Sequence, residues 1–302
     1  MTEDCRADPV AAAPPPRQPP LPPPSARSML LTVAGELVSN EPGGVRTNAL
    51  LPVFARLGIE DHACRQLLAR STRAGWLTRV RDGRTVRWTL DTRGRALVDD
   101  GVRRVAAFLS DERRWDGRWL VLNVNVPEDR RTLRKRLYGG LGWLGFGNPT
   151  VGVWITPHTE RAQDLAQLIS LLGLEQTSVA VTGHTVDLGL SESELVARAW
   201  DLTDLDKAYR RFLEQDAENP PPSTPDELLT AYLQLLNLQQ RFMRLDPQLP
   251  ATLQPEWVGR EAAAVFRARR AEWAAPAHQR FHEIVAETAP PGRRTSSNGS
   301  PD

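Results

Sequence analysis

The sequence predicts an α+β multidomain protein with a winged helix-turn-helix, then a small ferredoxin-type α+β domain, then an α-helical C-terminal domain. Three observations carry this prediction. Three helical patterns and a hairpin signal occupy residues 28–100. Apolar strands alternate with amphipathic helices up to residue 190, and helical periodicity alone continues to residue 288. The length of 302 residues suits two or three domains.

A proline-rich stretch, residues 1–27, precedes the first module and contains nine of the 25 prolines. Proline removes backbone donors and favours extended polyproline II, and this stretch has little apolar surface to bury. It also lacks the basic start and apolar centre of a signal peptide. We therefore expect disordered tails at 1–27 and at 289–302, where Gly and Ser follow the last helical pattern.

Residues 28–100 have the element order of a winged helix-turn-helix. Apolar residues recur at helical spacing in three segments, which span residues 30–38, 48–57 and about 60–73. Two β-branched segments then flank Asp82-Gly83, a strong signal for a two-residue hairpin. These strand segments are residues 76–81 and 85–90.

The second module is expected at residues 101–190, after a linking helix at about 92–109. A nearly continuous apolar run at 119–126 predicts a buried strand. The elements expected after it are a helix at 128–141, a strand at 151–156, a helix at 161–172 and a strand at 179–182 that 185–188 could extend. Strand–helix–strand–helix–strand in so short a segment fits a ferredoxin-type domain.

Residues 191–288 are predicted to be helical. Ser191-x-x-Glu194 and Thr224-Pro225-x-Glu227 are capping boxes. An amphipathic helix is expected over Asp226–Leu245. A further helix over Glu261–Trp273 is expected to break at Pro276.

Composition excludes several classes of protein. No apolar run approaches the roughly 18 residues that cross a bilayer, so we expect no membrane span. Two cysteines, Cys5 and Cys64, cannot form a disulfide framework, which favours the reducing cytoplasm. No nucleophile elbow, P-loop or dinucleotide fingerprint is present.

The formal net charge of +1 hides an uneven distribution. Nine arginines and two aspartates lie between His62 and Arg95, so this segment carries +7. The other 268 residues sum to −6, and residues 191–289 alone carry −5. The sequence therefore predicts a basic module joined to an acidic one.

The basic segment coincides with the third helix and the hairpin. On the helix, spacing predicts that Ala63, Leu67 and Leu68 face inward. The candidate DNA-binding residues on the outer face and around the hairpin turn are Arg65, Gln66, Arg70, Arg73, Arg81 and Arg84. Arginine can bind guanine bidentately and glutamine can read adenine, while arginines at a wing meet phosphates. A solvated arginine-rich surface is the alternative, because all basic residues except Lys135 and Lys207 are arginine.

Two other groups of residues leave alternatives open. The basic helix with Arg130, Arg131, Arg134, Lys135 and Arg136 could line DNA or hold the phosphates of an anionic ligand, and a solvated face is favoured. Trp115, Trp119, Trp143, Trp154 and Trp200 could pack an aryl effector, and filling the junctions between modules is favoured. We assign no ligand-binding residue from these patterns.

Ordered motifs over residues 28 to 285 resemble the PaaX family of bacterial repressors of phenylacetate catabolism. The N-terminal motifs are Leu30-Leu31-Thr32-Val33, Gly35-Glu36-Leu37, Arg65-Gln66-Leu67-Leu68-Ala69-Arg70, Gly75-Trp76-Leu77 and Gly83-Arg84. The most specific ones are Trp115-Asp116-Gly117-Arg118-Trp119, Val126-Pro127-Glu128, Trp143-Leu144-Gly145-Phe146-Gly147 and Trp154-Ile155-Thr156-Pro157-His158. Later ones are Arg198-Ala199-Trp200-Asp201-Leu202, Asp246-Pro247, Leu249-Pro250 and Pro255-x-Trp257-x-Gly259. The resemblance implies a Cas2-like middle domain, a homodimer on operator DNA and phenylacetyl-CoA as effector.

The main alternative function is an enzyme. The resemblance to Cas2 suggests that this enzyme would be a metal-dependent nuclease. Such nucleases hold a metal with an acidic residue at the end of the first strand, where this chain has Asn123 and Asn125. Amides are poor ligands for hard cations compared with carboxylates. Glu128 and Asp129 are expected to cap the next helix.

The histidines and Cys64 suggest no other chemistry. His278 and His282 have metal-ligand spacing, but no glutamate lies between them and surface histidines are favoured over zinc. His158 is interpreted as a turn residue and Cys64 as core packing instead of a redox sensor. We expect no catalytic residue, metal or cofactor.

The function predicted is a cytoplasmic transcription regulator, most simply a repressor of a catabolic operon. Its expected partners are double-stranded operator DNA, a second copy of the chain and a small-molecule effector such as an aryl- or acyl-CoA. The alternatives are the nuclease and an adaptor that binds an acidic protein through the basic module. Turnover of a substrate would favour the first alternative, and absence of a DNA footprint the second.

Overall fold

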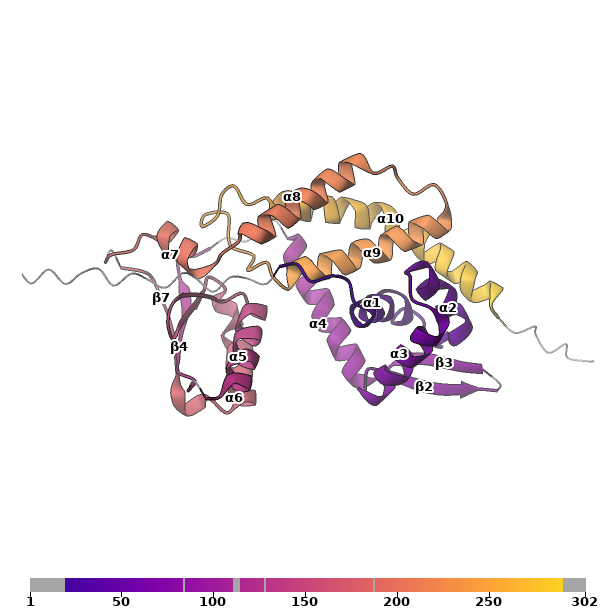
Figure 1. The fold of residues 1–302 in the computed structure, drawn as a ribbon, viewed down its shortest axis with the longest axis horizontal. Coiled ribbons are helices and arrows are strands. Elements are labelled where there is room, and N and C mark those ends of the chain that lie inside the picture. The colour runs from indigo at the N-terminus through magenta and orange to yellow at the C-terminus, as the bar shows by residue number, and fades with distance from the viewer. Residues whose placement is uncertain (1–19, 84, 111–114, 128, 187, 290–302) are drawn as a thin grey trace, which may run out of the picture. The chain divides into compact units, whose positions relative to one another are not determined.

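A computed structural model of the chain describes residues 20–289, except residues 84, 111–114, 128 and 187. It contains two compact units (Figure 1). Among the described residues, the first unit comprises 20–23, Arg104–Asn219 and Gln239–Phe266, and the second comprises Pro24–Arg103, Pro220–Leu238 and 267–289. Most of the tail expected at 1–27, and nearly all of that expected at 289–302, lie outside the described residues.

The second unit contains the winged helix-turn-helix. Its elements are α1 (Ala26–Val33), a π-helical turn (Ala34–Val38), β1 (Val45–Arg46), α2 (Thr47–Arg56), α3 (Asp61–Arg73), β2 (Leu77–Asp82) and β3 (Thr85–Leu90). The strands form one antiparallel sheet in the order β1-β3-β2. The expected helices and hairpin are therefore present. The two-residue strand β1 was not expected, because so short a segment carries no alternating pattern.

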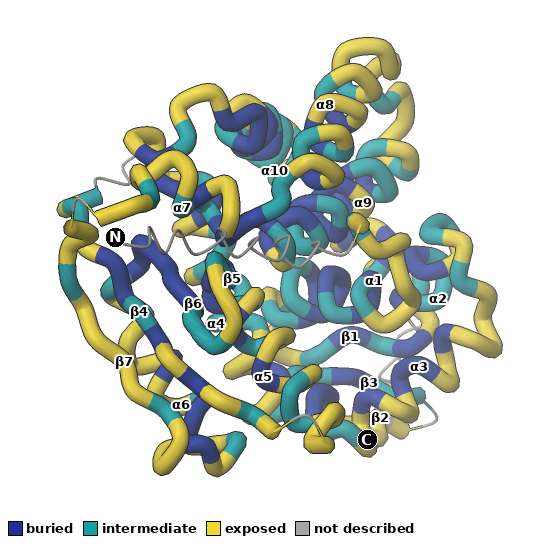
Figure 2. The backbone as a smooth tube through the Cα atoms, turned by 60° about the vertical axis from the view of Figure 1, so that its left-hand side comes forward, coloured by how far each residue is buried: buried dark blue, intermediate teal, exposed yellow. Residues whose placement is uncertain are grey.

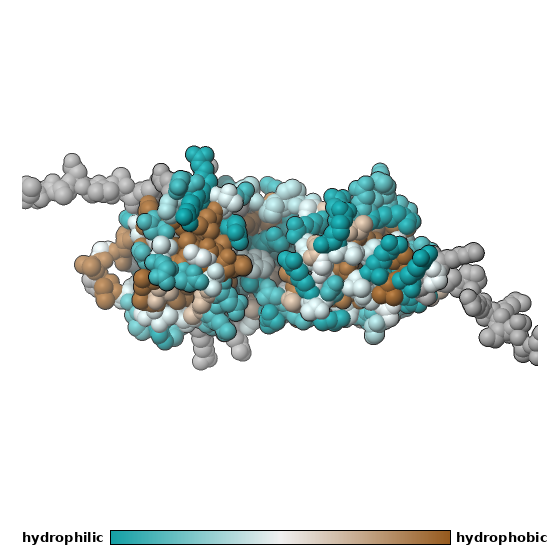
Figure 3. All heavy atoms as spheres, turned by 90° about the horizontal axis from the view of Figure 1, so that it is seen from below, coloured by the Kyte–Doolittle hydropathy of each residue, from teal (hydrophilic) through white to brown (hydrophobic). Residues whose placement is uncertain are grey.

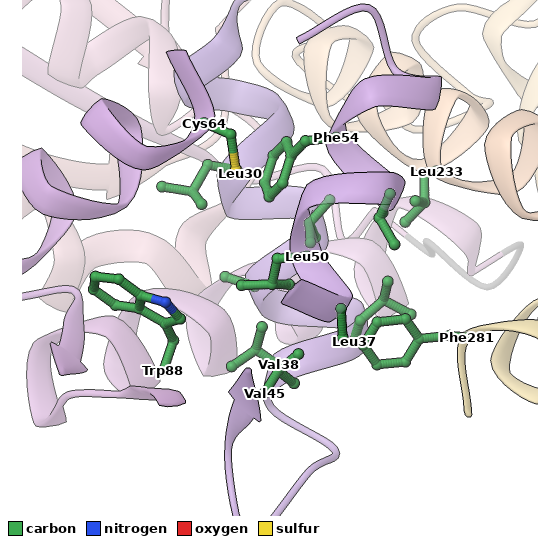
Figure 4. Close-up of a cluster of buried hydrophobic side chains, with 14 of the residues drawn as sticks. Leu30, Leu37, Val38, Val45, Leu50, Phe54, Cys64, Trp88, Leu233 and Phe281 are labelled. Atoms are coloured by element: carbon green, nitrogen blue, oxygen red, sulfur yellow. The ribbon is translucent and has the colours of Figure 1, made fainter. Parts of the chain in front are cut away.

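The core of this unit joins residues far apart in the sequence. Leu30, Leu37, Leu50 and Phe54 from the first helices are buried together with Cys64 of α3 (Figure 4). Residues from two C-terminal helices, α9 (Pro225–Met243) and α10 (Gly259–Glu287), complete the same cluster. They are Leu229, Tyr232, Leu233, Leu236, Ala277, Phe281 and Ile284. The N-terminal module thus shares its core with the C-terminal segment.

Ion pairs and hydrogen bonds hold these helices to the helix-turn-helix. Asp226 of α9 accepts hydrogen bonds from Arg56 of α2 and from Arg280 of α10, each at 2.6 Å. Glu36 Oε1 accepts a hydrogen bond from Tyr232 Oη at 2.6 Å and lies 3.0 Å from His278 Nε2. Both buried apolar contacts and these polar bonds therefore join α9 and α10 to the N-terminal helices.

α10 continues through Pro276, contrary to the expected break. Proline inside a helix removes one backbone hydrogen bond, so the local preference is to end there. Here Ala277, Phe281 and Ile284 follow the proline and are buried at 2% exposure or less. Burying these side chains in the core of the second unit outweighs the local preference.

The first unit is built on a ferredoxin-type domain. Its elements are β4 (Trp119–Val124), α5 (Arg131–Trp143), β5 (Gly147–Thr150), β6 (Val153–Thr156), α6 (Ala162–Leu172) and β7 (Ser178–Gly183). The strands form an antiparallel sheet in the order β5-β6-β4-β7, with α5 and α6 on one face (Figure 1). β4 is largely buried in the centre, whereas β7 is an exposed edge strand (Figure 2).

Three details of this domain differ from the sequence-based expectation. β5 was not expected, because Gly147-Asn148-Pro149-Thr150 has no strand pattern. The described residues between 185 and 188 do not extend β7. α5 begins at Arg131, so Asp129 precedes the helix and does not lie in its first turn. Glu128, the other expected cap, lies outside the described residues.

Helices follow the ferredoxin-type domain, as expected. They are α7 (Glu192–Ala199), α8 (Thr203–Glu218) and then α9 and α10, while α4 (Thr92–Leu109) is the expected linking helix. Ser191 and Glu194 form the capping box of α7. Thr224 Oγ1 accepts from the Glu227 amide at 3.2 Å, and Glu227 accepts from the Thr224 amide at 3.3 Å. The order of fold types along the chain is the one predicted.

Candidate nucleic-acid interface

α3 has one buried face and one exposed polar face. Cys64, Leu67, Leu68 and Ser71 are buried at a spacing of three to four residues, which places them on the core side of the helix. The residues predicted to face outward, Arg65, Gln66, Ala69, Arg70 and Arg73, are all exposed. The expectation for Ala63 is wrong, because Ala63 is exposed and its neighbour Cys64 fills the inward position.

Cys64 is a free, completely buried cysteine. Burial and the nearby charge of Asp61 raise the pKa of its thiol to about 11. A thiol with so high a pKa carries almost no thiolate at neutral pH and is a poor nucleophile. The interpretation of Cys64 as a core residue is therefore confirmed by its burial.

Gln66 lies between His62 and Arg70, which are one helical turn before and after it on α3. Its amide nitrogen lies 2.8 Å from His62 Nε2, and its amide oxygen accepts a hydrogen bond from Arg70 Nη2 at 3.4 Å. These contacts restrict the rotamers of Gln66 while its side chain stays exposed. Restricting a side chain beforehand reduces the entropy lost when it binds a base edge.

The hairpin extends this surface beyond the helix. β2 and β3 pair in register from Leu77–Leu90 to Asp82–Thr85, which leaves a two-residue turn with Gly83 at a φ of 60°. Arg79 and Arg81 are exposed on β2. Arg84, the other residue predicted at the wing, lies outside the described residues. The hairpin therefore presents Arg81 next to the turn, as a wing requires.

The exposed arginines on α3 and β2 have no salt-bridge partner among the described carboxylates. Six of the surface residues, Arg65, Gln66, Arg70, Arg73, Arg79 and Arg81, are called the basic face below. None of its five arginines forms a salt bridge with a described carboxylate. The part of the second unit that contains α3 and the hairpin carries long hydrophilic side chains over much of its visible surface (right in Figure 3). Such an uncompensated surface attracts a polyanion.

The histidines considered as metal ligands have other partners. His278 Nε2 lies 3.0 Å from Glu36 Oε1, and His282 Nε2 lies 3.2 Å from Glu41 Oε1. His158 is buried in the first unit, with Nε2 at 2.8 Å from the carbonyl oxygen of Pro247. No group of three or more potential metal-ligating side chains gathers among the described residues. Asn123 and Asn125, at the strand end where a Cas2-type carboxylate would lie, are exposed amides.

The tryptophans of the first unit pack against other aromatic rings, and two of them line a cavity beside the basic helix. Trp119 stacks on Trp200 at 6.3 Å between ring centroids, and Trp115 meets Trp119 edge-on at 5.1 Å. Trp154 contacts Tyr138 at 4.8 Å. Trp143 and Trp200 also line a cavity, together with Arg131, Arg134 and Lys135 of the basic helix. The sequence patterns did not reveal that cavity.

Three family models match the chain in order. The model described as "PaaX-like protein" matches residues 25–94, "PaaX protein central Cas2-like domain" matches 112–195, and "PaaX-like protein C-terminal domain" matches 200–283. No curated protein matches the chain significantly. A solved structure titled "Uncharacterized protein Rv0674 from Mycobacterium tuberculosis" is similar in fold, with a TM-score of 0.56 and 24% identity. That similarity covers 86% of this chain and 98% of the other. Among the described residues, no helix combines the length and the apolar character that crossing a bilayer demands.

Proposed function

The chain belongs to the PaaX family, whose three domains it carries in order, and from this premise we propose that it is a DNA-binding repressor of a catabolic operon. In this proposal an acyl-CoA effector such as phenylacetyl-CoA releases the protein from its operator. The protein acts by binding and not by catalysis.

The observation that carries the proposal is the basic face. Its five arginines lie on a helix and a hairpin that are fixed by one core, and none is paired with a described carboxylate. Each phosphate that an arginine neutralises releases a counterion from the DNA, so such a surface supplies affinity for any duplex. The arrangement of helix and wing adds the shape needed to read one sequence.

The residues divide into two roles. Arg65, Gln66 and Arg70 are proposed to face the major groove, where arginine reads guanine and glutamine reads adenine. The small Ala69 between them lets α3 approach the bases. Arg73, Arg81 and Arg84 are proposed to contact phosphates and so set the position of the helix on the duplex.

A homodimer is part of the proposal. Two copies related by twofold symmetry present two recognition helices to a palindromic operator, with half-sites about one helical turn apart or a multiple of it. The dimer would have two arrangements of its recognition helices, of which only one matches the half-sites. An effector that binds the other arrangement more tightly releases the repressor from its operator.

A gel-shift titration of the full chain tests the proposal. The probe is the DNA upstream of the protein's own gene, with a scrambled duplex of equal length as the control. We expect a specific complex whose affinity falls by about 10³-fold or more between about 50 and 200 mM salt, as for proteins with several phosphate contacts. Equal and weak retardation of both duplexes would overturn the proposal. Hydrolysis of the thioester when phenylacetyl-CoA is added would favour an enzyme instead.

A further inference from the structure

The first unit contains a cavity of about 950 Å³ next to α5. It is bounded by α5, the segment that follows it, Trp200 and residues Arg244–Pro247. This volume lies at the upper end of the range found for small-molecule sites in proteins. The cavity is separate from the basic face, because its lining belongs to the first unit alone.

Among the described residues, the lining contains four cations and no acid. Arg131, Arg134 and Lys135 come from α5, and Arg244 follows α9. None of the four forms a salt bridge within the described part of the chain. Arg134 Nη2 donates to the carbonyl oxygen of Val126 at 3.3 Å, which orients its guanidinium. Several uncompensated cations at one hollow favour a ligand with more than one negative charge.

Aromatic side chains form the other part of the lining. Tyr138, Trp143, Phe146 and Trp200 contribute to it. The Trp143 ring is held by two guanidinium groups, those of Arg104 at 4.0 Å and Arg244 at 5.6 Å from its centroid. The parts of these four rings that face the cavity offer flat apolar surface. They favour a ligand with a planar apolar group.

Two exposed glycines of α5 border the cavity. A Cβ atom added at Gly139 or at Gly142 would meet nothing within 4 Å, so packing requires glycine at neither position. Both lie inside α5, where glycine is less favourable than alanine. Gly140 differs, because a Cβ there would lie 2.6 Å from Leu168 Cδ1 of α6. Thus Gly140 is required by the packing of α5 on α6, whereas a side chain at Gly139 or Gly142 would extend into the open space beside α5.

We propose that this cavity is the effector site and takes an organic anion that carries two or more phosphates and a flat apolar group, the chemistry of an aryl-CoA thioester. The phosphates lie among Arg131, Arg134, Lys135 and Arg244, and the acyl group lies against Trp143 and its aromatic neighbours. The location rests on the cavity alone, whereas the identity of the ligand as effector rests on the proposed function.

Isothermal titration of the full-length protein tests the site directly, without DNA. The probes are phenylacetyl-CoA, coenzyme A and phenylacetate. We expect phenylacetyl-CoA to bind most tightly, coenzyme A more weakly and phenylacetate not measurably. Failure of both CoA compounds to bind, or binding of phenylacetate alone, overturns the inference.

Gly142→Leu fills the cavity with a good helix former and is expected to weaken phenylacetyl-CoA binding at least tenfold. Arg131→Ala is expected to weaken it severalfold by removing one cation. The matched control is Gly101→Leu in α4, where a Cβ also meets nothing within 4 Å and which does not line the cavity. Equal affinity of Gly142→Leu, Arg131→Ala and wild type places the ligand elsewhere.

Operator binding separates this inference from the proposed function. If wild type leaves its operator with phenylacetyl-CoA and Gly142→Leu leaves it equally, the cavity is not the effector site and the repressor proposal stands. If the protein binds no operator but loses ligand affinity in Gly142→Leu, the site stands and the repressor proposal fails.

Discussion

Tyr209 Oη donates a hydrogen bond of 2.8 Å to Asp246 Oδ2 in the interior of the first unit. The same oxygen accepts from Trp257 Nε1 at 3.1 Å, and Oδ1 accepts from the Gln248 amide at 2.6 Å. A Cβ at Gly259 would lie 2.4 Å from Trp257 Nε1. The motif residues Asp246, Trp257 and Gly259 are therefore parts of one hydrogen-bonded assembly around a buried carboxylate.

Replacing Asp246 with alanine leaves the Tyr209 hydroxyl and the Trp257 indole buried without their acceptor. Each buried donor without a partner costs about 1–3 kcal/mol, so we expect the free energy of unfolding to fall by at least about 2 kcal/mol. Tyr209→Phe removes one donor and leaves Asp246 its other partners, so its cost should be about 1 kcal/mol. Urea unfolding followed by tryptophan fluorescence measures both. Equal costs for the two variants would contradict this account of the assembly.

Arg81→Ala should weaken binding to operator and scrambled DNA alike. A side chain that contacts phosphate carries no base information, and its loss lowers the slope of log affinity against log salt by about 1 for each subunit of the proposed dimer. The slope is measured by fluorescence anisotropy at several salt concentrations. Arg211→Ala is the matched control, because Arg211 is an exposed arginine of α8 that lies in the other unit. An unchanged slope for Arg81→Ala would remove the hairpin from the DNA interface.

Gln66→Ala should change which base pairs the protein prefers. Loss of a bidentate contact to adenine costs about 1–3 kcal/mol at one base pair and leaves the others unaffected. Binding to a set of operators with single base-pair substitutions locates that position. Gln279→Ala in α10 is the control, since that glutamine is also exposed and lies outside the basic face. A uniform loss of affinity over all operators would assign Gln66 to the DNA backbone.

Phe281→Ala should destabilise the second unit although the residue is far from α3 in the sequence. Phe281 is 1% exposed in the cluster that contains Leu50, Phe54 and Leu68. Truncating a buried phenylalanine costs about 3–5 kcal/mol. We expect a lower thermal midpoint and a loss of operator binding at temperatures where wild type still binds. Full stability of Phe281→Ala would mean that α10 is dispensable for the core of the helix-turn-helix.

Cys64 should react slowly with disulfide reagents in the native protein. Its thiol pKa of about 11 means that the reactive thiolate is scarce near neutral pH and becomes more abundant only as the pH approaches that value. The measurement uses a Cys5→Ser background, in which Cys64 is the remaining cysteine. We expect rapid reaction in urea, slow reaction without it, and no release of DNA by mild oxidants. Fast native labelling at pH 7 would show that the thiol is accessible.

Much of the helix-turn-helix could be predicted because its signals are local. The spacing of Leu67 and Leu68 fixes which face of α3 is buried, and Asp82-Gly83 fixes the hairpin turn. The error at Ala63 is instructive. Both Ala63 and Cys64 are small and apolar, so composition could not decide between adjacent positions, and the packing of Cys64 against the core decides it.

Features that depend on distant residues could not be predicted. Proline normally ends a helix, so the sequence around Pro276 predicts a break. α10 continues because Phe281 and Ile284, which follow the proline, are buried in the core. The cavity unites α5 with Arg244, which lies about a hundred residues later, so no periodic pattern reveals it. Glycine has no side chain, so the sequence at Gly139 and Gly142 does not indicate that open space lies beside α5.

The shared core of the second unit has a consequence for how the protein is made. The helix-turn-helix leaves the ribosome before α9 and α10, yet its core lacks Leu233 and Phe281 until those two helices have been translated. Domains usually fold in order during synthesis, and contacts between distant segments form slowly. The basic face is therefore translated before the helices that complete its core, and a nascent chain that stops before α9 carries these arginines without that support.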